Sequence, residues 1–156
     1  MTEKIWLQPR IIAYTQILLD NFNHLLGYQL ISRKEDTKEQ AKALFKADFV
    51  VVSHGIQTDP ILNYGNQTAL DLWVMDWADF TQTPSRLTAE PMNRSERAAM
   101  LEPAKIRGYI DNYQGVRIAS TGQKFYIKQA IIWNLVDSLG NKCGQAATFS
   151  DWETIE

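Results

Sequence analysis

The last third of the chain, from Gly108 to Trp152, alternates strand-forming segments with turn signals, and this pattern limits the fold more than any other feature. The segments are rich in β-branched and aromatic residues, and Thr121-Gly122 and residues 138–141 separate them. This alternation predicts a meander of antiparallel strands joined by short turns. The expected strands cover residues 115–120, 124–137 and 143–152.

The middle segment carries an apolar row at its odd positions, from Phe125 to Leu135, which only Gln129 interrupts. Such a period-two row predicts a strand with one buried face. A buried amide without hydrogen-bond partners costs about 1–3 kcal/mol. Gln129 and Gln145, which interrupts the last segment in the same way, are therefore expected to bond to each other, to the backbone or to a ligand.

The turn lengths predict which side chains share a face of the sheet. A two-residue loop in the first turn would place Val116 and Ile118 on the face of the odd row. The second turn allows two registers. A loop of odd length places Gln145 with Trp133, whereas a loop of even length places it beside Asn134, and we expect the odd loop.

The N-terminal part begins with an amphipathic helix over Ile11 to Gly27. Gly27 is the expected stop. The apolar stripe must cover either one face of the sheet or the equivalent helix of a second copy, so this helix is also the expected interface of a homodimer. The residues of the stripe are Ile11, Tyr14, Leu18, Phe22, Leu25 and Leu26.

A second helix is expected near Thr37, because Thr37 and Gln40 have the spacing of a capping box. It should bury Leu44 and Phe45.

The middle of the chain reads as two strands followed by short helices. Asn66 is the expected cap of a helix over residues 67–73, in which Ala69, Leu70 and Trp73 share a face. A helix from Ser95 should kink or break at Pro103. The further expected elements are strands over 49–53 and 61–64 and a helical turn over 76–80.

This order of elements predicts one α+β domain, with an N-terminal helical segment over residues 1–48 and a core over residues 49–156.

Composition excludes several classes of protein. The formal net charge is −2, so no overall field favours nucleic acid or an anionic membrane. Cys143 is the single cysteine, which rules out an internal disulfide. The first residues lack the apolar run of a signal peptide, and no segment approaches the roughly 20 apolar residues that span a bilayer. We therefore expect a cytoplasmic protein that binds neither nucleic acid nor membrane.

Several short motifs stand out along the chain. They are His54-Gly55, Asp59-Pro60-Ile61, Asn63-Tyr64-Gly65-Asn66, Pro84-Ser85-Arg86-Leu87, Arg94-Ser95-Glu96-Arg97, Gly108-Tyr109-Ile110-Asp111, Tyr113-Gln114-Gly115-Val116-Arg117-Ile118, Trp133-Asn134-Leu135 and Gly144-Gln145-Ala146-Ala147-Thr148-Phe149. These motifs resemble the MEKHLA domain family, and the similarity extends from about the first helix to Trp152. This family is related to PAS domains and occurs both as small stand-alone bacterial proteins and at the C-terminus of plant homeodomain-leucine zipper transcription factors. The chain resembles the stand-alone form, although Pro103 departs from the unbroken helix expected of the family.

The resemblance implies a PAS-like five-stranded antiparallel sheet in spatial order 2-1-5-4-3, with short helices over its concave face. It also implies a sensory or regulatory domain without established catalysis, whose ligand is not generally defined. From the amphipathic helix and the polar interruptions in the meander, we expect a module that binds a small, largely apolar ligand or a protein partner. The identity of the ligand stays open. Haem is disfavoured because the expected helix after Ser95 lacks a histidine, and a covalent flavin adduct is disfavoured because Cys143 begins the last strand.

The candidate binding residues come from the inferred enclosure and from polar groups beside it. Trp73, Trp133 and Phe149 could line a pocket for a flat molecule or could be plain core. Arg86 and Arg117 could bind a carboxylate or a phosphate, or could pair with Glu90, Asp111 or Glu102. Strand alternation would place Arg117 on the face opposite the pocket. The expected ligand-binding set is His54, Asn66, Trp73, Arg86, Gln129, Trp133, Gln145 and Phe149.

Two further functions remain as alternatives. A small enzyme could use His54 with Asp59 as an acid-base pair, although a histidine that bonds a turn is the simpler explanation. A pure dimerisation module would have no cavity. The sequence contains no phosphate-binding loop, dinucleotide fingerprint or nucleophile elbow, and its two histidines and one cysteine are too scattered to predict a metal site.

Overall fold

The computed structural model describes residues 4–89, 102 and 105–155. The expected kink at Pro103, most of the helix after Ser95 and Glu90 lie outside these residues. The elements in chain order are η1 (Ile5–Leu7), α1 (Pro9–Leu26), α2 (Thr37–Phe45), β1 (Val50–His54), β2 (Leu62–Gly65), α3 (Gln67–Trp73), α4 (Trp77–Phe80), η2 (Ser85–Thr88), β3 (Tyr109–Ile118), β4 (Lys124–Val136), β5 (Lys142–Phe149) and β6 (Asp151–Ile155).

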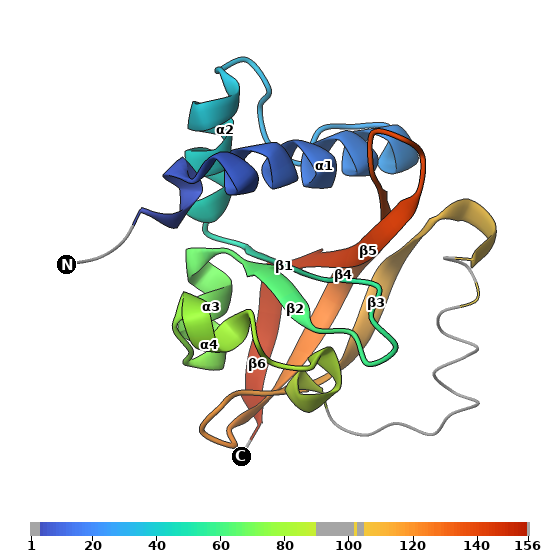
Figure 1. Cartoon of the computed structure of the whole chain (residues 1–156). Helices are drawn as coiled ribbons and strands as arrows, with labels where there is room; N and C mark the ends of the chain where they lie inside the picture. The colour runs from blue at the N-terminus through green and yellow to red at the C-terminus, as the bar shows by residue number, and fades with distance from the viewer. Residues whose placement is uncertain (1–3, 90–101, 103–104, 156) are drawn as a thin grey trace.

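The strands form one antiparallel sheet in the order β2-β1-β5-β4-β3 (Figure 1). The expected order is confirmed. The last expected strand divides at Ser150 into β5 and β6, and β6 pairs with the first half of β4 as a sixth strand.

Helices cover the two faces of the sheet (Figure 1). We call the face under α1 the outer face, because the Trp133 indole nitrogen donates to the Leu18 carbonyl across 3.2 Å. We call the face under α3 the inner face, because Trp73 of α3 packs edge-on against Phe125, with 5.2 Å between ring centroids. The core therefore lies in two layers, one on each side of the sheet.

The N-terminal helices begin and end close to the predicted residues. Pro9 occupies the first turn of α1, and Gly27 ends the helix with a left-handed φ of 82°. α2 begins at Thr37 as expected, but Asp36 rather than Thr37 is the cap, and its carboxylate accepts from the Glu39 backbone N–H across 2.9 Å.

The apolar stripe of α1 packs inside the chain rather than standing free. Leu18 and Phe22 are completely buried, and Phe22 meets Trp133 edge-on with 5.0 Å between ring centroids. Asn21 fixes the other end of the contact, because its amide bonds both the N–H and the carbonyl of Val136. α1 is thereby attached to β4 through both apolar and polar contacts.

The expected inward row from Phe125 to Leu135 is wrong, because the row changes face. Phe125 lies on the inner face and Trp133 on the outer face, although both positions are odd. Gln129, between them, is exposed and has a left-handed φ of 53°. A residue in this conformation interrupts the alternation of a strand, so every later side chain points to the opposite face.

The neighbouring strand has a matching irregularity at Asn112, where φ is 57° and the β3–β4 register shifts on both sides of Tyr113. Asn112 and Gln129 thus lie on adjacent strands and mark a line across the sheet at which the side-chain alternation reverses. Neither residue is a glycine, and although asparagine tolerates a left-handed φ, glutamine is not a usual residue at such a position.

Both hairpin registers also differ from the prediction. In the first, the Ala119 N–H donates to the Gln123 carbonyl across 2.9 Å, which leaves three residues in the loop and places Arg117, rather than Ile118, opposite Phe125. Val116 and Ile118 therefore face away from the inner row.

In the second hairpin, a register shift between Leu135 and Val136 places Gln145 opposite Asn134 and Ala147 opposite Ile132. The expectation of an odd loop, with Gln145 beside Trp133, is therefore wrong. The even register puts Gln145 on the inner face, because Phe149, four residues further along β5, packs against Trp73 there.

Candidate functional site

The two faces of the central strands differ in accessibility. On the outer face, Ser53, Trp133, Leu135 and Ala146 are each at most 2% exposed. On the inner face of the same strands, several side chains remain partly exposed even though they lie in the middle of the sheet. We define the open inner face as these residues and the two isoleucines beside them: Val52, His54, Ile110, Ile132, Asn134, Gln145 and Ala147.

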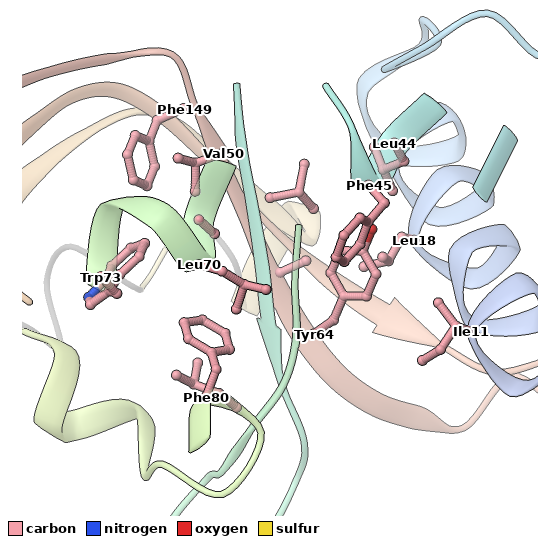
Figure 2. Close-up of a cluster of buried hydrophobic side chains, with 14 of the residues drawn as sticks. Ile11, Leu18, Leu44, Phe45, Val50, Tyr64, Leu70, Trp73, Phe80 and Phe149 are labelled. Atoms are coloured by element: carbon pink, nitrogen blue, oxygen red, sulfur yellow. The ribbon is translucent and has the colours of Figure 1, made fainter. Parts of the chain in front are cut away.

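The other half of the inner face is filled by aromatic side chains. Trp73 is only 2% exposed and meets Phe80, Phe125 and Phe149 at centroid distances of 5.2–6.2 Å. Figure 2 shows Trp73, Phe80 and Phe149 gathered around α3, on the opposite side of β1 and β2 from Phe45 and Tyr64. Trp73 and Phe149 therefore form the closed end of the inner layer and do not line an open surface.

Two buried polar atoms lack a hydrogen-bond partner in the described part of the chain. They are the Trp73 indole nitrogen and the Tyr64 hydroxyl. Burial raises the pKa of Tyr64 far above its ordinary value, so this phenol stays neutral. Unpaired buried donors of this kind are rare in native proteins and are destabilising by themselves.

An amide pair gives the open inner face its polar group. The Gln145 Nε2 donates to the Asn134 Oδ1 across 3.1 Å. His54 is the cross-strand neighbour of Gln145 on β1. Below this pair, Ile132 and Ile110 pack with Tyr113 and Ala147 in a small apolar cluster. The surface thus combines an apolar floor with amide donors and acceptors at one end.

The candidate acid-base pair does not form. His54 Nδ1 lies 2.9 Å from the carbonyl oxygen of its neighbour Gly55, which is the turn-bonding role that the simpler explanation gave it. The Asp59 carboxylate instead accepts from Arg86 Nε across 3.2 Å, and both of these side chains are more than half exposed. Arg86 and Asp59 therefore connect the β1–β2 loop to η2 at the surface.

Asn66 has four hydrogen bonds that hold local structure. Its Oδ1 accepts from the N–H groups of Val51 and Ala69, and its Nδ2 donates to the carbonyls of Leu44 and Phe49. The bond to Ala69 is the expected helix cap. Because both atoms of the completely buried amide already have two partners, Asn66 has no bonding capacity left for a ligand.

The structure therefore separates the eight expected binding residues. His54 and Gln145 lie together on the open inner face. Trp73 and Phe149 belong to the adjoining aromatic core, and the remaining four lie elsewhere: Asn66, Arg86, Gln129 and Trp133.

Sequence reasoning missed a polar cluster that ties α1 to the sheet. The Tyr14 hydroxyl lies 2.7 Å from Ser53 Oγ and donates to Asn63 Oδ1 across 3.1 Å, while Ser53 Oγ also donates to this oxygen. Burial raises the pKa of Tyr14 to about 12. The three residues are far apart in the sequence, so only the tertiary structure brings them together. The thiol of Cys143 is partly buried, and its burial raises the pKa of that group as well.

An antiparallel sheet in this order, with short helices over one face, defines a PAS-like fold. Three solved structures share the fold. The PAS domain of a protein from Colwellia psychrerythraea has 13% identity and a TM-score of 0.61, and the match covers 76% of this chain and 95% of that one. A light-oxygen-voltage domain studied with a flavin analogue has 18% identity and a TM-score of 0.55, with 76% and 85% covered. An RNA-binding light-oxygen-voltage receptor has 18% identity and a TM-score of 0.63, with 80% and 36% covered.

The chain belongs to the MEKHLA domain family, whose model matches residues 12–154. The comparison with curated proteins found no match to this sequence. Across residues 4–89, 102 and 105–155, no helix has the length and apolar character needed to cross a membrane. The same residues contain no group of three or more histidine, cysteine or acidic side chains that could hold a metal ion.

Proposed function

We propose that this chain is a sensory module that binds a small, largely apolar ligand on the open inner face. One observation carries the proposal: the outer face of the central strands is sealed, whereas Val52, Ala147 and an amide pair on the inner face of the same strands stay partly exposed. Ligand sites combine these features, since apolar contact gives affinity and a few polar groups fix orientation.

The amide pair favours a ligand with both a donor and an acceptor at one edge. Gln145 donates one N–H of its amide to Asn134, and its carbonyl oxygen and second N–H group can accept from and donate to a ligand. A flat heterocycle with an imide or amide edge matches this arrangement, while its ring would lie over Ile132 and Ala147. No reaction is required, because neither His54 nor Asp59 has the partner that acid-base chemistry needs.

The signal would leave the site through β4 and α1. Asn134 follows Trp133, which bonds Leu18, and lies two residues before Val136, which Asn21 holds at both its N–H and its carbonyl. A ligand that bonds Gln145 would act on Asn134 through the hydrogen bond between the two amides and change the position of this strand segment, and α1 would move with it. A ligand can shift such an equilibrium only by its difference in affinity for the two positions.

A homodimer through α1 remains a proposal, and it would have to use the exposed side of that helix. Leu18 and Phe22 are unavailable because they are completely buried in the chain itself. Arg10, Asp20 and Asn23 are exposed, which makes the free side of the helix polar. Sedimentation velocity at several concentrations measures the oligomeric state. A cytoplasmic location also stays a proposal, for which the single cysteine is the support.

Native mass spectrometry of the purified protein tests the proposed site. We expect a bound small molecule on the wild type and on Ala78→Trp, whose change lies on the exposed surface of α4. We expect its loss from Ala147→Trp, which places an indole over the open inner face. If the purified protein shows no added mass from a bound small molecule, riboflavin is the first compound to add. One structural neighbour is a light-oxygen-voltage domain studied with a flavin analogue. A molecule held equally by all three proteins would contradict the proposed site.

A further inference from the structure

Arg117 lies on the inner face of β3, contrary to the sequence prediction. It is the cross-strand neighbour of Phe125, which packs against Trp73 on that face. Tyr113, on the other side of Gly115, points to the same side, and the Arg117 guanidinium carbon is 5.4 Å from the centre of the Tyr113 ring. A half-buried cation thus stands over an aromatic ring beside the open inner face.

The charge of Arg117 has no carboxylate partner in the described part of the chain, unlike that of three other arginines. Arg33, Arg86 and Arg107 form ion pairs with Asp20, Asp59 and Asp111. Arg117 instead donates to the Val116 carbonyl across 3.2 Å. One of the carboxylates considered as its partner, Asp111, is taken by Arg107. A guanidinium that is partly removed from water and not neutralised attracts an oxyanion, which it can bind through two parallel N–H groups.

Gly115 lies between Tyr113 and Arg117 on the inner face, and its lack of a side chain lets both of them pack over bare backbone. A Cβ atom built at Gly115 would lie 3.4 Å from Arg117 Nη1 and 3.4 Å from the Tyr113 hydroxyl oxygen. Two hydrogen-bond donors from different side chains are therefore close to each other, so one carboxylate or phosphate group can accept from both.

The same tyrosine connects this point to the open inner face. Tyr113 packs against the apolar cluster of Ile110 and Ile132, and Ala147 contacts that cluster too. A single molecule could therefore contact the apolar floor with its body and reach Arg117 with a charged group.

We propose that Arg117 and Tyr113 form an oxyanion subsite, so that the ligand of the open inner face is a planar or apolar molecule carrying a carboxylate or a phosphate. This inference rests on the proposed function, because it assigns a charged group to the same ligand. Arg117 provides the charge and Tyr113 a second donor.

NMR of the arginine Nε–H groups tests the subsite directly in the whole chain. Inorganic phosphate and acetate are titrated separately, and the cross-peaks of Arg117, Arg86 and Arg107 are followed in one spectrum. We expect a saturable shift at Arg117, with Arg86 and Arg107 showing only small linear shifts. The anion that saturates at the lower concentration identifies the preferred group. Loss of the hydroxyl in Tyr113→Phe should weaken the interaction about tenfold, as expected for a hydrogen bond to a charged group.

An Arg117 shift no larger than that of the exposed Arg86 would overturn the subsite. Thermal unfolding of Tyr113→Phe and Arg117→Gln checks that both variants remain folded. Native mass spectrometry separates this inference from the proposed function. A molecule bound to the wild type and retained equally by Arg117→Gln would refute the anionic group while leaving the site itself supported. A bound molecule that is lost from Arg117→Gln but not from Arg86→Gln would support both.

Discussion

Replacement of Asn66 by alanine is expected to be among the most destabilising changes outside the apolar core. The amide accepts from Val51 and Ala69 and donates to Leu44 and Phe49, at 2.8–3.2 Å. Loss of a helix cap costs about 1 kcal/mol. Each of the other three bonds leaves a buried backbone group without its partner, at about 1 kcal/mol or more apiece. The sum is about 4 kcal/mol, which is a large part of the 5–15 kcal/mol stability of a typical domain.

Asp76→Ala is the matched control for this change. Asp76 caps α4 with a single bond to the Asp79 N–H across 2.8 Å, and it is exposed. Its removal should cost only the cap contribution of about 1 kcal/mol. Urea unfolding followed by tryptophan fluorescence gives both free energies. If Asn66→Ala lowers the free energy of unfolding no more than Asp76→Ala does, the buried bonds of Asn66 do not hold β1, α2 and α3 together as argued.

Three further changes test other parts of the structure. Gly144→Ala brings a methyl carbon into steric clash with the His54 carbonyl oxygen, so it should lower the free energy of unfolding in urea by about 1–3 kcal/mol. Gly115→Ala meets nothing nearer than 3.4 Å and should cost much less. Val74→Asn should raise the free energy of unfolding by about 1 kcal/mol in the same assay, because the exposed Val74 has a left-handed φ of 57° that asparagine tolerates better. An unchanged or lower urea midpoint would show that the backbone of Val74 is not strained. Burial raises the pKa of Tyr14 to about 12, so the folded chain keeps a proton that the unfolded chain, with a pKa near 10, releases. The contribution of the Tyr14 hydroxyl to the free energy of unfolding is complete below pH 10 and declines by up to about 2.7 kcal/mol as the pH rises to 12. The difference in free energy of unfolding between wild type and Tyr14→Phe should therefore narrow over that range, and a constant difference would contradict the raised pKa of Tyr14.

The local elements could be predicted from the sequence because their signals are local. The apolar spacing and the terminal glycine placed α1 within two residues of its observed ends, and Asn66 was recognised as a cap. The order of the strands came from the resemblance to a known family, since periodicity cannot say which strands are neighbours.

The faces of the meander could not be predicted because they depend on two backbone conformations. Gln129 and Asn112 adopt left-handed φ values without being glycine, and the reversal at Gln129 sends Trp133 to the side of α1. The register of each hairpin likewise depends on which loop N–H meets which carbonyl, as at Ala119 and Gln123. These errors moved Arg117 off the inner face and Trp133 onto it.

In the candidate site, too, the residues with a local sequence signal could be predicted and their partners could not. Gln145 was singled out because a polar residue interrupted an apolar row, and it does bond a second amide, but that amide is Asn134. The pairing follows from the even register, which the sequence left open. The cluster of Tyr14, Ser53 and Asn63 joins a helix to two strands and has no sequence signature at all.

The central claim is that the inner face of the sheet, rather than the side under α1, holds a ligand. The most direct measurement compares isoleucine methyl NMR spectra of the protein as isolated and after unfolding and refolding free of small molecules. The methyl signals of Ile110 and Ile132 are expected to move most, because these side chains lie at the proposed site, while those of Ile17 on α1 and Ile131 on the outer face should move less. Identical spectra, or shifts confined to Ile17 and Ile131, would contradict this claim.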